Sequence, residues 1–259
     1  GRLIRQWGEY KQRIAGGHDQ SYREDYQRSG EMLRQAIAIF RGQYDRLSLM
    51  EAYNEYGTLL MQQEDWRGAH NQYRLSLDLA YGLQNNYRIA DNLSDFGILY
   101  FRKARSAQME TDDYAKALKY SKDAIEKAKG TKAYYLISKA SQTAASIYFY
   151  LKEYDTMIEF AADAVTGILR LDPDHFFESA AKRNLEYERV VKWLREDILY
   201  QLPDIQLVQQ AVDVLTRRWN EEKVNQTGKI LANEFPGFIK TMELVLNDYH
   251  ILHVPGGTQ

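Results

Sequence analysis

The sequence of 259 residues contains no cysteine and only four prolines. Without cysteine there can be no disulfide framework and no zinc site built on thiolates. No apolar run approaches the roughly 18 residues that a membrane helix needs, and the N-terminus shows no signal-peptide core. These absences favour a cytoplasmic protein that has no membrane partner.

A strong charge of either sign is also absent, because the formal net charge at pH 7 is only −2. The overall electrostatics therefore give no reason to expect a nucleic-acid partner. The lysines between residues 116 and 129 are interrupted by Asp123 and Glu126, as is typical of a solvated helix face. We expect this region to bind no nucleic acid.

Strand signals are missing too. The sequence has no Asn-Gly or Asp-Gly hairpin turn and no sustained alternation of apolar and polar residues. The four prolines stand at positions 173, 203, 236 and 255, so the first 172 residues contain no such helix breaker. This contrast predicts an all-α chain with an internal boundary near residue 172.

Helical periodicity is present instead. Apolar residues recur at spacings of three and four over residues 53–61 and again over 66–80. Only Gln63, Glu64 and Asp65 separate the two stretches, which predicts an antiparallel helical hairpin. Gly57 lies in the middle of the first helix, where glycine costs roughly 1 kcal/mol against alanine. We expect Gly57 and Ala69 to stand where the two helices approach closely.

This hairpin pattern repeats along the chain. Tyr53-x-x-Tyr56-Gly57-x-x-Leu60 recurs as Leu93-x-x-Phe96-Gly97-x-x-Tyr100 and as Ser141-x-x-Ala144-Ala145-x-x-Tyr148. The second half recurs after an insertion around residues 103–112. The repeated small and aromatic residues expected at helix contacts are Gly57, Trp66, Ala69, Gly97, Tyr114, Ala117, Ala145 and Tyr154. One hairpin cannot bury both of its apolar faces, so the copies are expected to stack.

The repeats resemble the tetratricopeptide repeat (TPR) family over residues 22–172. Their length near forty is similar to that of the kinesin-light-chain and bacterial regulator branch. The resemblance implies a right-handed α-solenoid of TPR-like hairpins that is not an enzyme and binds a protein or peptide in its concave groove.

Four segments are predicted from these signals. Residues 1–20 form an N-terminal amphipathic helix and a Gly-Gly joint, and residues 21–172 form the repeats. Residues 173–254 form a C-terminal helical extension that caps the repeats, and residues 255–259 form a flexible tail. Homo-oligomerisation through the N-terminal or C-terminal helices is left open.

The candidate groove lies on the first helix of each hairpin, which lines the concave side of such a stack. Its predicted residues are Asn54, Thr58, Met61, Asp91, Ser94, Phe101, Arg102, Lys139, Gln142, Phe149 and Tyr150. The aromatic residues are costly to leave in water, and the amides can bind a peptide backbone. Glu51 and Asp91 make one end acidic, so a bound segment is expected to be basic there and acidic towards Arg102.

No motif for catalysis, nucleotide binding or a cofactor occurs. His250 and His253 could place two imidazoles one helical turn apart, but without a third certain ligand they predict no metal site. Capping accounts for Asp172 before Pro173. The alternative function is a ligand-sensing module of a larger signalling or transcription-regulating protein whose effector domain lies outside this sequence.

Overall fold

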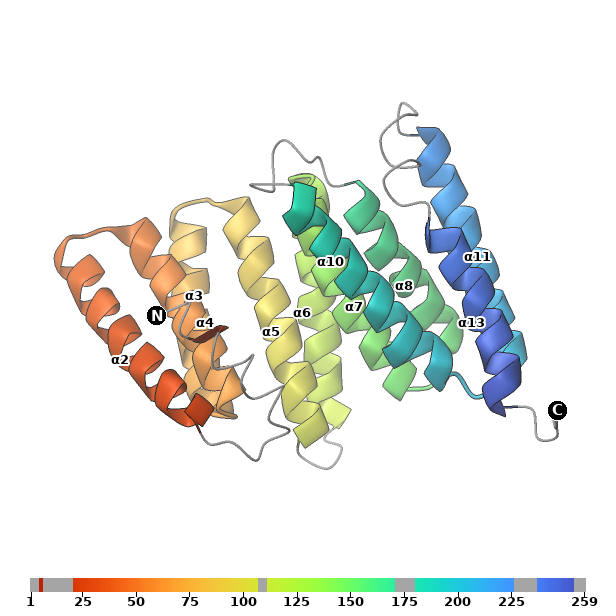
Figure 1. Ribbon diagram of the computed structural model, residues 1–259. Coiled ribbons are helices and arrows are strands. Elements are labelled where there is room, and N and C mark those ends of the chain that lie inside the picture. The colour runs from red at the N-terminus through yellow and green to blue at the C-terminus, as the bar shows by residue number, and fades with distance from the viewer. Residues whose placement is uncertain (1–4, 7–20, 107–110, 171–179, 226–236, 254–259) are drawn as a thin grey trace. The chain divides into compact units, whose positions relative to one another are not determined.

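The computed structural model describes residues 5–6, 21–106, 111–170, 180–225 and 237–253. Within these ranges the regular structure is helical and no β-strand occurs (Figure 1). The chain divides into two compact units, Gly1–Lys127 and Ala128–Gln259. The predicted all-α class is confirmed. In each unit consecutive helices pack as neighbours, which is the arrangement of an α-solenoid.

The first unit is a series of long helices joined by short turns. They are α2 (Ser21–Gly42), α3 (Arg46–Gln62), α4 (Trp66–Gly82), α5 (Asn86–Ser106) and α6 (Thr111–Gly130), whose last residues belong to the second unit. Helix α3 packs against both α2 and α4, and α4 packs against α5 (Figure 1). The predicted hairpin is therefore the pair α3 and α4.

The second unit continues the helical pattern. It contains α7 (Tyr134–Tyr150), α8 (Tyr154–Leu169), α10 (Ala180–Trp193), a π-helical turn (Leu194–Ile198), a 3-10 turn (Leu199–Gln201), α11 (Ile205–Asn225) and α13 (Gly237–His253). The described residues of the segment predicted as a C-terminal extension are mostly helical, and α10 runs directly into the π-helical turn. The N-terminal segment predicted over residues 1–20 lies outside the described residues apart from residues 5–6.

One turn geometry recurs five times among the residues that the structure describes. Each turn has one non-glycine residue with a positive φ between 52° and 61°, and these residues are Tyr44, Glu64, Gln84, Lys132 and Lys152. Twenty positions separate neighbouring members within each unit. The left-handed conformation costs a side-chain-bearing residue roughly 1–2 kcal/mol, so the turn is retained because it reverses the chain within a few residues.

The residue after each of these positions begins the next helix. In the first unit Asp45, Asp65 and Asn85 each accept a hydrogen bond from the backbone N–H three residues on, at 3.1, 2.8 and 3.1 Å. In the second unit Ala133 and Glu153 stand at the same place and make no such side-chain bond. Among these five turns, side-chain caps therefore occur in the three of the first unit; in the second unit Asp204 caps α11 in the same way, accepting from the Leu207 N–H at 2.9 Å.

Glycines mark the closest helix contacts. A Cβ on Gly57 would lie 2.7 Å from Cδ1 of Tyr73, and a Cβ on Gly97 would lie 2.5 Å from Oγ of Ser121. In the second unit a Cβ on Gly167 would lie 2.9 Å from both the backbone N of Ser138 and the backbone O of Tyr134. At these points one helix lies in the space that a side chain of its neighbour would take.

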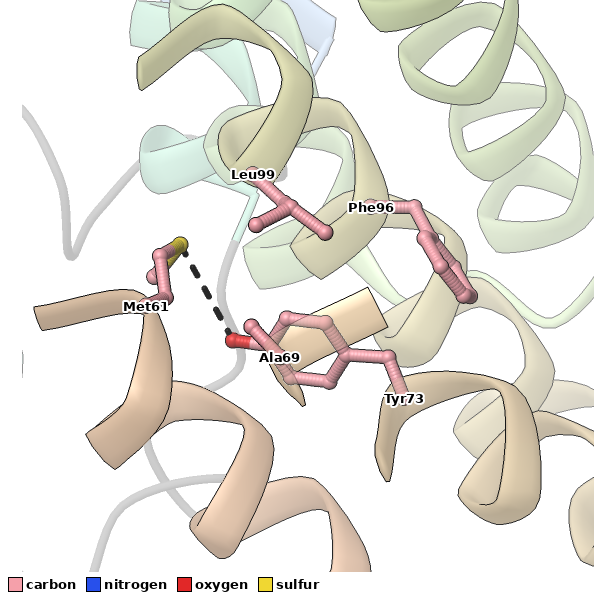
Figure 2. Packing of buried hydrophobic residues seen from close by; sticks show 5 residues of the cluster. All are labelled: Met61, Ala69, Tyr73, Phe96 and Leu99. Carbon is pink, nitrogen blue, oxygen red and sulfur yellow. Dashed lines mark hydrogen bonds between the residues drawn. The ribbon is translucent and has the colours of Figure 1, made fainter. Parts of the chain in front are cut away.

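The core of the first unit forms around these contacts. Met61, Ala69, Tyr73, Phe96 and Leu99 make one buried cluster from α3, α4 and α5 (Figure 2). Trp66 packs on it while partly buried, and the predicted contact residues Tyr114 and Ala117 are buried on α6. In the second unit Ala145 is buried, and the ring of Tyr154 lies 6.3 Å from that of Phe149.

Candidate binding cavity

A cavity of about 280 Å³ opens in the first unit where α2, α3 and α5 come together. The residues that line it are Leu33, Ala36, Phe40, Ser48, Met50, Glu51, Ala52, Asn54, Glu55, Ser76, Arg88, Asp91 and Asn92. Most of them lie on α3 and α5, the first helices of the two hairpins in this unit.

The apolar part of the lining belongs to the packed interior. Met50 and Ala52 are buried on α3, and Leu33 is buried on α2. The hydroxyl of Ser76 on α4 donates a 2.9 Å hydrogen bond to the backbone oxygen of Met50. Because the Ser76 hydroxyl is buried, the bond satisfies it and ties α4 to α3 at the cavity wall.

The charged part of the lining is centred on Arg88. Its guanidinium forms an ion pair with Glu51 on α3 and a second one with Asp91 on its own helix, at 3.5 Å for the latter. The backbone N–H of Arg88 is held by the Asn85 cap. Arg88 therefore joins the start of α5 to α3 across the cavity.

The side-chain amides of Asn54 and Asn92 also connect α3 to α5 at the cavity. Nδ2 of Asn54 donates to Oδ1 of Asn92 at 3.3 Å and to Oδ2 of Asp95 at 2.7 Å. Nδ2 of Asn92 in turn donates to the backbone oxygen of Arg88 at 2.8 Å. An ionised carboxylate only accepts hydrogen bonds, so Asp95 fixes which side of the Asn54 amide faces it. The side-chain oxygen of this amide, Oδ1 of Asn54, is therefore the atom that can accept a hydrogen bond from a further donor.

Arg5 reaches this region too. Nη2 of Arg5 donates to Oε2 of Glu55 at 2.9 Å, and Arg5 is only 7% exposed. Glu55 lines the cavity. A guanidinium from outside the helical hairpins therefore lies against one of the cavity carboxylates.

The structure brings Asn54 and Asp91 of the predicted groove together at this cavity. The hydroxyl of Thr58 lies on α3 near them, 3.1 Å from the backbone oxygen of Asn54 and 3.0 Å from the Tyr73 hydroxyl. Met61 and Ser94 are buried in the first unit, where they are not available to a partner. Both are therefore removed from the set of groove residues.

The remaining predicted residue positions lie elsewhere. On α5, Phe101 is half-buried against Tyr114 and Arg102 is exposed. On α7 in the second unit, the amide nitrogen of Gln142 lies 3.4 Å from both oxygens of Ser138, and Lys139 is half-buried. Phe149 and Tyr150 form an edge-to-face pair in which Tyr150 is 45% exposed.

Of the lining residues, only Asn54 and Asp91 are among the predicted groove residues, and the ones that the prediction misses include Glu55, Arg88 and Asn92. A signal for this part of the site is present in the sequence, because residues 91–95 include four polar side chains in the middle of a helix. Such a density of polar groups at buried positions indicates a hydrogen-bonded network, and Asn92 and Asp95 are indeed buried.

Other chemistry has little support in the described ranges. No group of three or more His, Cys, Asp or Glu residues is close enough there to hold a metal ion. None of the helices described is long and apolar enough to cross a membrane. His70 lies against Phe96 and Tyr100, whose hydroxyl is 3.1 Å from Nδ1 of His70. His175 and the side chains of His250 and His253 fall outside the described residues.

Comparison with known proteins gives a fold and no family. No family model matches the chain, and no curated protein matches it. A crystal structure of BtubC (BKLC) from P. vanneervenii is similar, with a TM-score of 0.55 and 16% sequence identity. The match covers 90% of this chain and 95% of BtubC. The chain therefore shares the helical fold of BtubC.

Proposed function

We propose that this chain is a non-catalytic scaffold that binds a segment of another protein, or a peptide, at the cavity between α2, α3 and α5. The observation that carries the proposal is the chemical make-up of the cavity. An apolar wall stands beside two amides and three carboxylates, all held by hydrogen bonds and ion pairs within the unit. Amides can pair with a peptide backbone, and apolar contacts supply affinity.

The fold supports the same conclusion. The chain shares its helical fold with BtubC, and stacked helical hairpins present extended surfaces on which partners bind. Such a surface can bind a partner without a catalytic group or a cofactor.

A phage-displayed library of random twelve-residue peptides tests the proposal. Peptides selected on the full chain should bind it and fail to bind an Ala36→Trp variant, since residue 36 lines the cavity and a larger side chain fills it. Ala38→Trp is the matched control, because Ala38 is exposed on the same helix. Peptides that bind both variants equally, with melting temperatures unchanged, would contradict the proposal.

The predicted aromatic groove positions give an independent arm of that test. Phe101 and Tyr150 do not line the cavity, so Phe101→Ala and Tyr150→Ala should leave cavity binding unchanged, and a loss of affinity in either variant would favour the groove predicted from the sequence, where aromatic anchors contribute most of the affinity. Arg102→Glu is expected mainly to slow association.

A second candidate is a sensor module that binds a small polar molecule. The size of the cavity favours it, since about 280 Å³ lies at the lower end of the range for small-molecule sites. Melting temperatures measured against a collection of small polar compounds test this candidate. A compound that stabilises the native chain but not Ala36→Trp would favour the sensor.

A further inference from the structure

The cavity lacks positive charge relative to its carboxylates. Glu51, Glu55 and Asp91 line it with Arg88 as the cationic residue among the described lining residues. Arg88 is already shared between Glu51 and Asp91. The carboxylate of Glu55 lies on the next turn of α3 after Glu51 and forms an ion pair with Arg5, which comes from outside the lining.

Arg5 shows what this carboxylate accepts. It belongs to no hairpin of the unit, yet its guanidinium is held on Glu55 with 7% of the residue exposed. A guanidinium from a separate segment thus has a site here in the structure itself. The amide oxygen of Asn54 and the neighbouring Glu51 supply further acceptors on the same helix.

We propose that the cavity of the first unit binds an arginine side chain of a basic segment in a protein partner, and that Arg5 competes for the same site within the chain. The inference rests on the proposed function and names its ligand class. A guanidinium is planar and carries five donors, so it can reach acceptors on more than one side chain, whereas an ammonium acts as a point charge. The aliphatic stem of an arginine suits the apolar wall formed by Leu33 and Phe40.

Fluorescein-labelled hexaarginine is the probe, with hexalysine and hexaglutamate as comparison peptides, and fluorescence anisotropy measures their affinity for the full chain at about 0.15 M salt. Hexaarginine is expected to bind more tightly than hexalysine, and hexaglutamate is expected not to bind. Glu51→Gln with Glu55→Gln should weaken hexaarginine binding about tenfold or more, as loss of charged hydrogen bonds does. Glu31→Gln with Asp78→Asn removes the same charge from exposed positions of the unit and should have a much smaller effect.

Competition by Arg5 makes a separate prediction. Arg5→Ala should tighten hexaarginine binding about threefold or more, because an internal competitor lowers apparent affinity by the fraction of sites that it leaves free. Arg74→Ala removes an equal charge from an exposed site on α4 and should leave the affinity nearly unchanged. If the Arg5→Ala variant binds hexaarginine no more tightly than the Arg74→Ala variant does, Arg5 does not compete for the site.

Two further results would overturn the ligand class. One is an equal loss of hexaarginine affinity in the Glu51/Glu55 double variant and in the Glu31/Asp78 control variant. That result would mean that the net charge of the unit, and not the cavity, attracts the peptide. The other is hexalysine binding as tightly as hexaarginine. If library peptides without arginine bind at the cavity while hexaarginine does not, the proposed function stands and this inference fails. If no peptide of any composition binds, both fail.

Discussion

The ring of Tyr73 occupies the space that a side chain on Gly57 would need. A Cβ at position 57 would lie 2.7 and 2.8 Å from two ring carbons, and Tyr73 is fully buried on the facing helix. The hydroxyl of Tyr73 reaches on to Met61 and Thr58 of the glycine's own helix. Gly57 is thus the position at which α3 receives the largest fully buried side chain of α4.

Gly57→Leu is expected to lower the free energy of unfolding by about 1–3 kcal/mol or more, because the added atoms overpack a filled core. Gly57→Ala is expected to be destabilising too, though less so, since its gain in helix propensity of roughly 1 kcal/mol offsets part of the strain. Thermal or denaturant unfolding measures both variants.

Gly42→Ala is the matched control, because no atom lies within 4 Å of a Cβ at that helical glycine. It should be neutral or slightly stabilising. If Gly57→Leu unfolds at the same denaturant concentration as Gly42→Ala, the close contact does not exist in solution.

The hairpin was predictable because it is local. The spacing of Gly57, Ala69 and Tyr73 depends only on two helical periods and a three-residue turn. The cavity was not, because it requires Leu33, Glu55 and Arg88 to meet from three helices, and no periodic pattern encodes that meeting. The predicted domain boundaries stay predictions.

The predicted groove residues also show what helical periodicity cannot predict, in this case which residues of one helix face are buried. Ser94 and Asp91 are three positions apart and share one face of α5, yet Ser94 is fully buried and Asp91 is half-exposed. Periodicity predicts that Met61 faces the groove, whereas in the structure it belongs to the same buried cluster as Tyr73 (Figure 2). Periodicity gives the face of a helix, whereas burial depends on how far along that face the neighbouring helix extends.

Helix caps give a second prediction. Asp65→Ala should cost about 1 kcal/mol, because the N–H of Gly68 loses the carboxylate that it donates to at 2.8 Å. Glu153→Ala removes a residue from the equivalent position of α8, where no side-chain bond exists, and should change stability by no more than a few tenths of a kcal/mol. Equal effects of the two variants in denaturant unfolding would show that Asp65 does not act as a cap.

The recurrent left-handed turns give a third prediction. Glu64→Gly should be neutral to stabilising by up to about 1 kcal/mol, because glycine adopts a φ of 61° without the cost that a side chain brings. Its larger freedom in the unfolded chain opposes part of this gain. Glu64→Val should destabilise, and unfolding curves of the two variants compared with the native chain measure the difference.

Arg170 and Glu222 form the best-defined ion pair of the second unit. Nε of Arg170 donates to Oε2 of Glu222 at 2.8 Å, and a second nitrogen pairs with the other oxygen. Arg170→Leu should cost about 1–3 kcal/mol, because it leaves the buried Glu222 carboxylate without this partner. Adding Glu222→Leu should recover much of that loss.

A double-mutant cycle in denaturant measures this coupling. Arg189→Leu serves as the control, because its pair with Glu186 lies within one exposed helix turn and should contribute little. Strict additivity of the Arg170 and Glu222 changes would mean that the two side chains do not interact in solution.

The last prediction concerns pH and His70. Burial holds the pKa of His70 below its ordinary value, and the charge of Arg74 lowers it further. The native state therefore binds a proton less readily than the unfolded chain does. Stability from this residue is fully present above the unfolded pKa near 6.5 and is lost as the pH falls from there through the lower folded pKa.

His70→Gln should flatten the fall in unfolding free energy between about pH 7 and pH 5, since glutamine does not titrate. Arg74→Gln should shift the His70 titration upward in pH, because a like charge that opposed protonation is gone. NMR of the His70 ring protons follows that titration directly. Because Nδ1 of His70 lies 3.1 Å from the Tyr100 hydroxyl, the neutral ring can accept that hydrogen bond and protonation would require the hydroxyl to turn. A His70 titration at or above pH 6.5 would contradict the direction argued from burial.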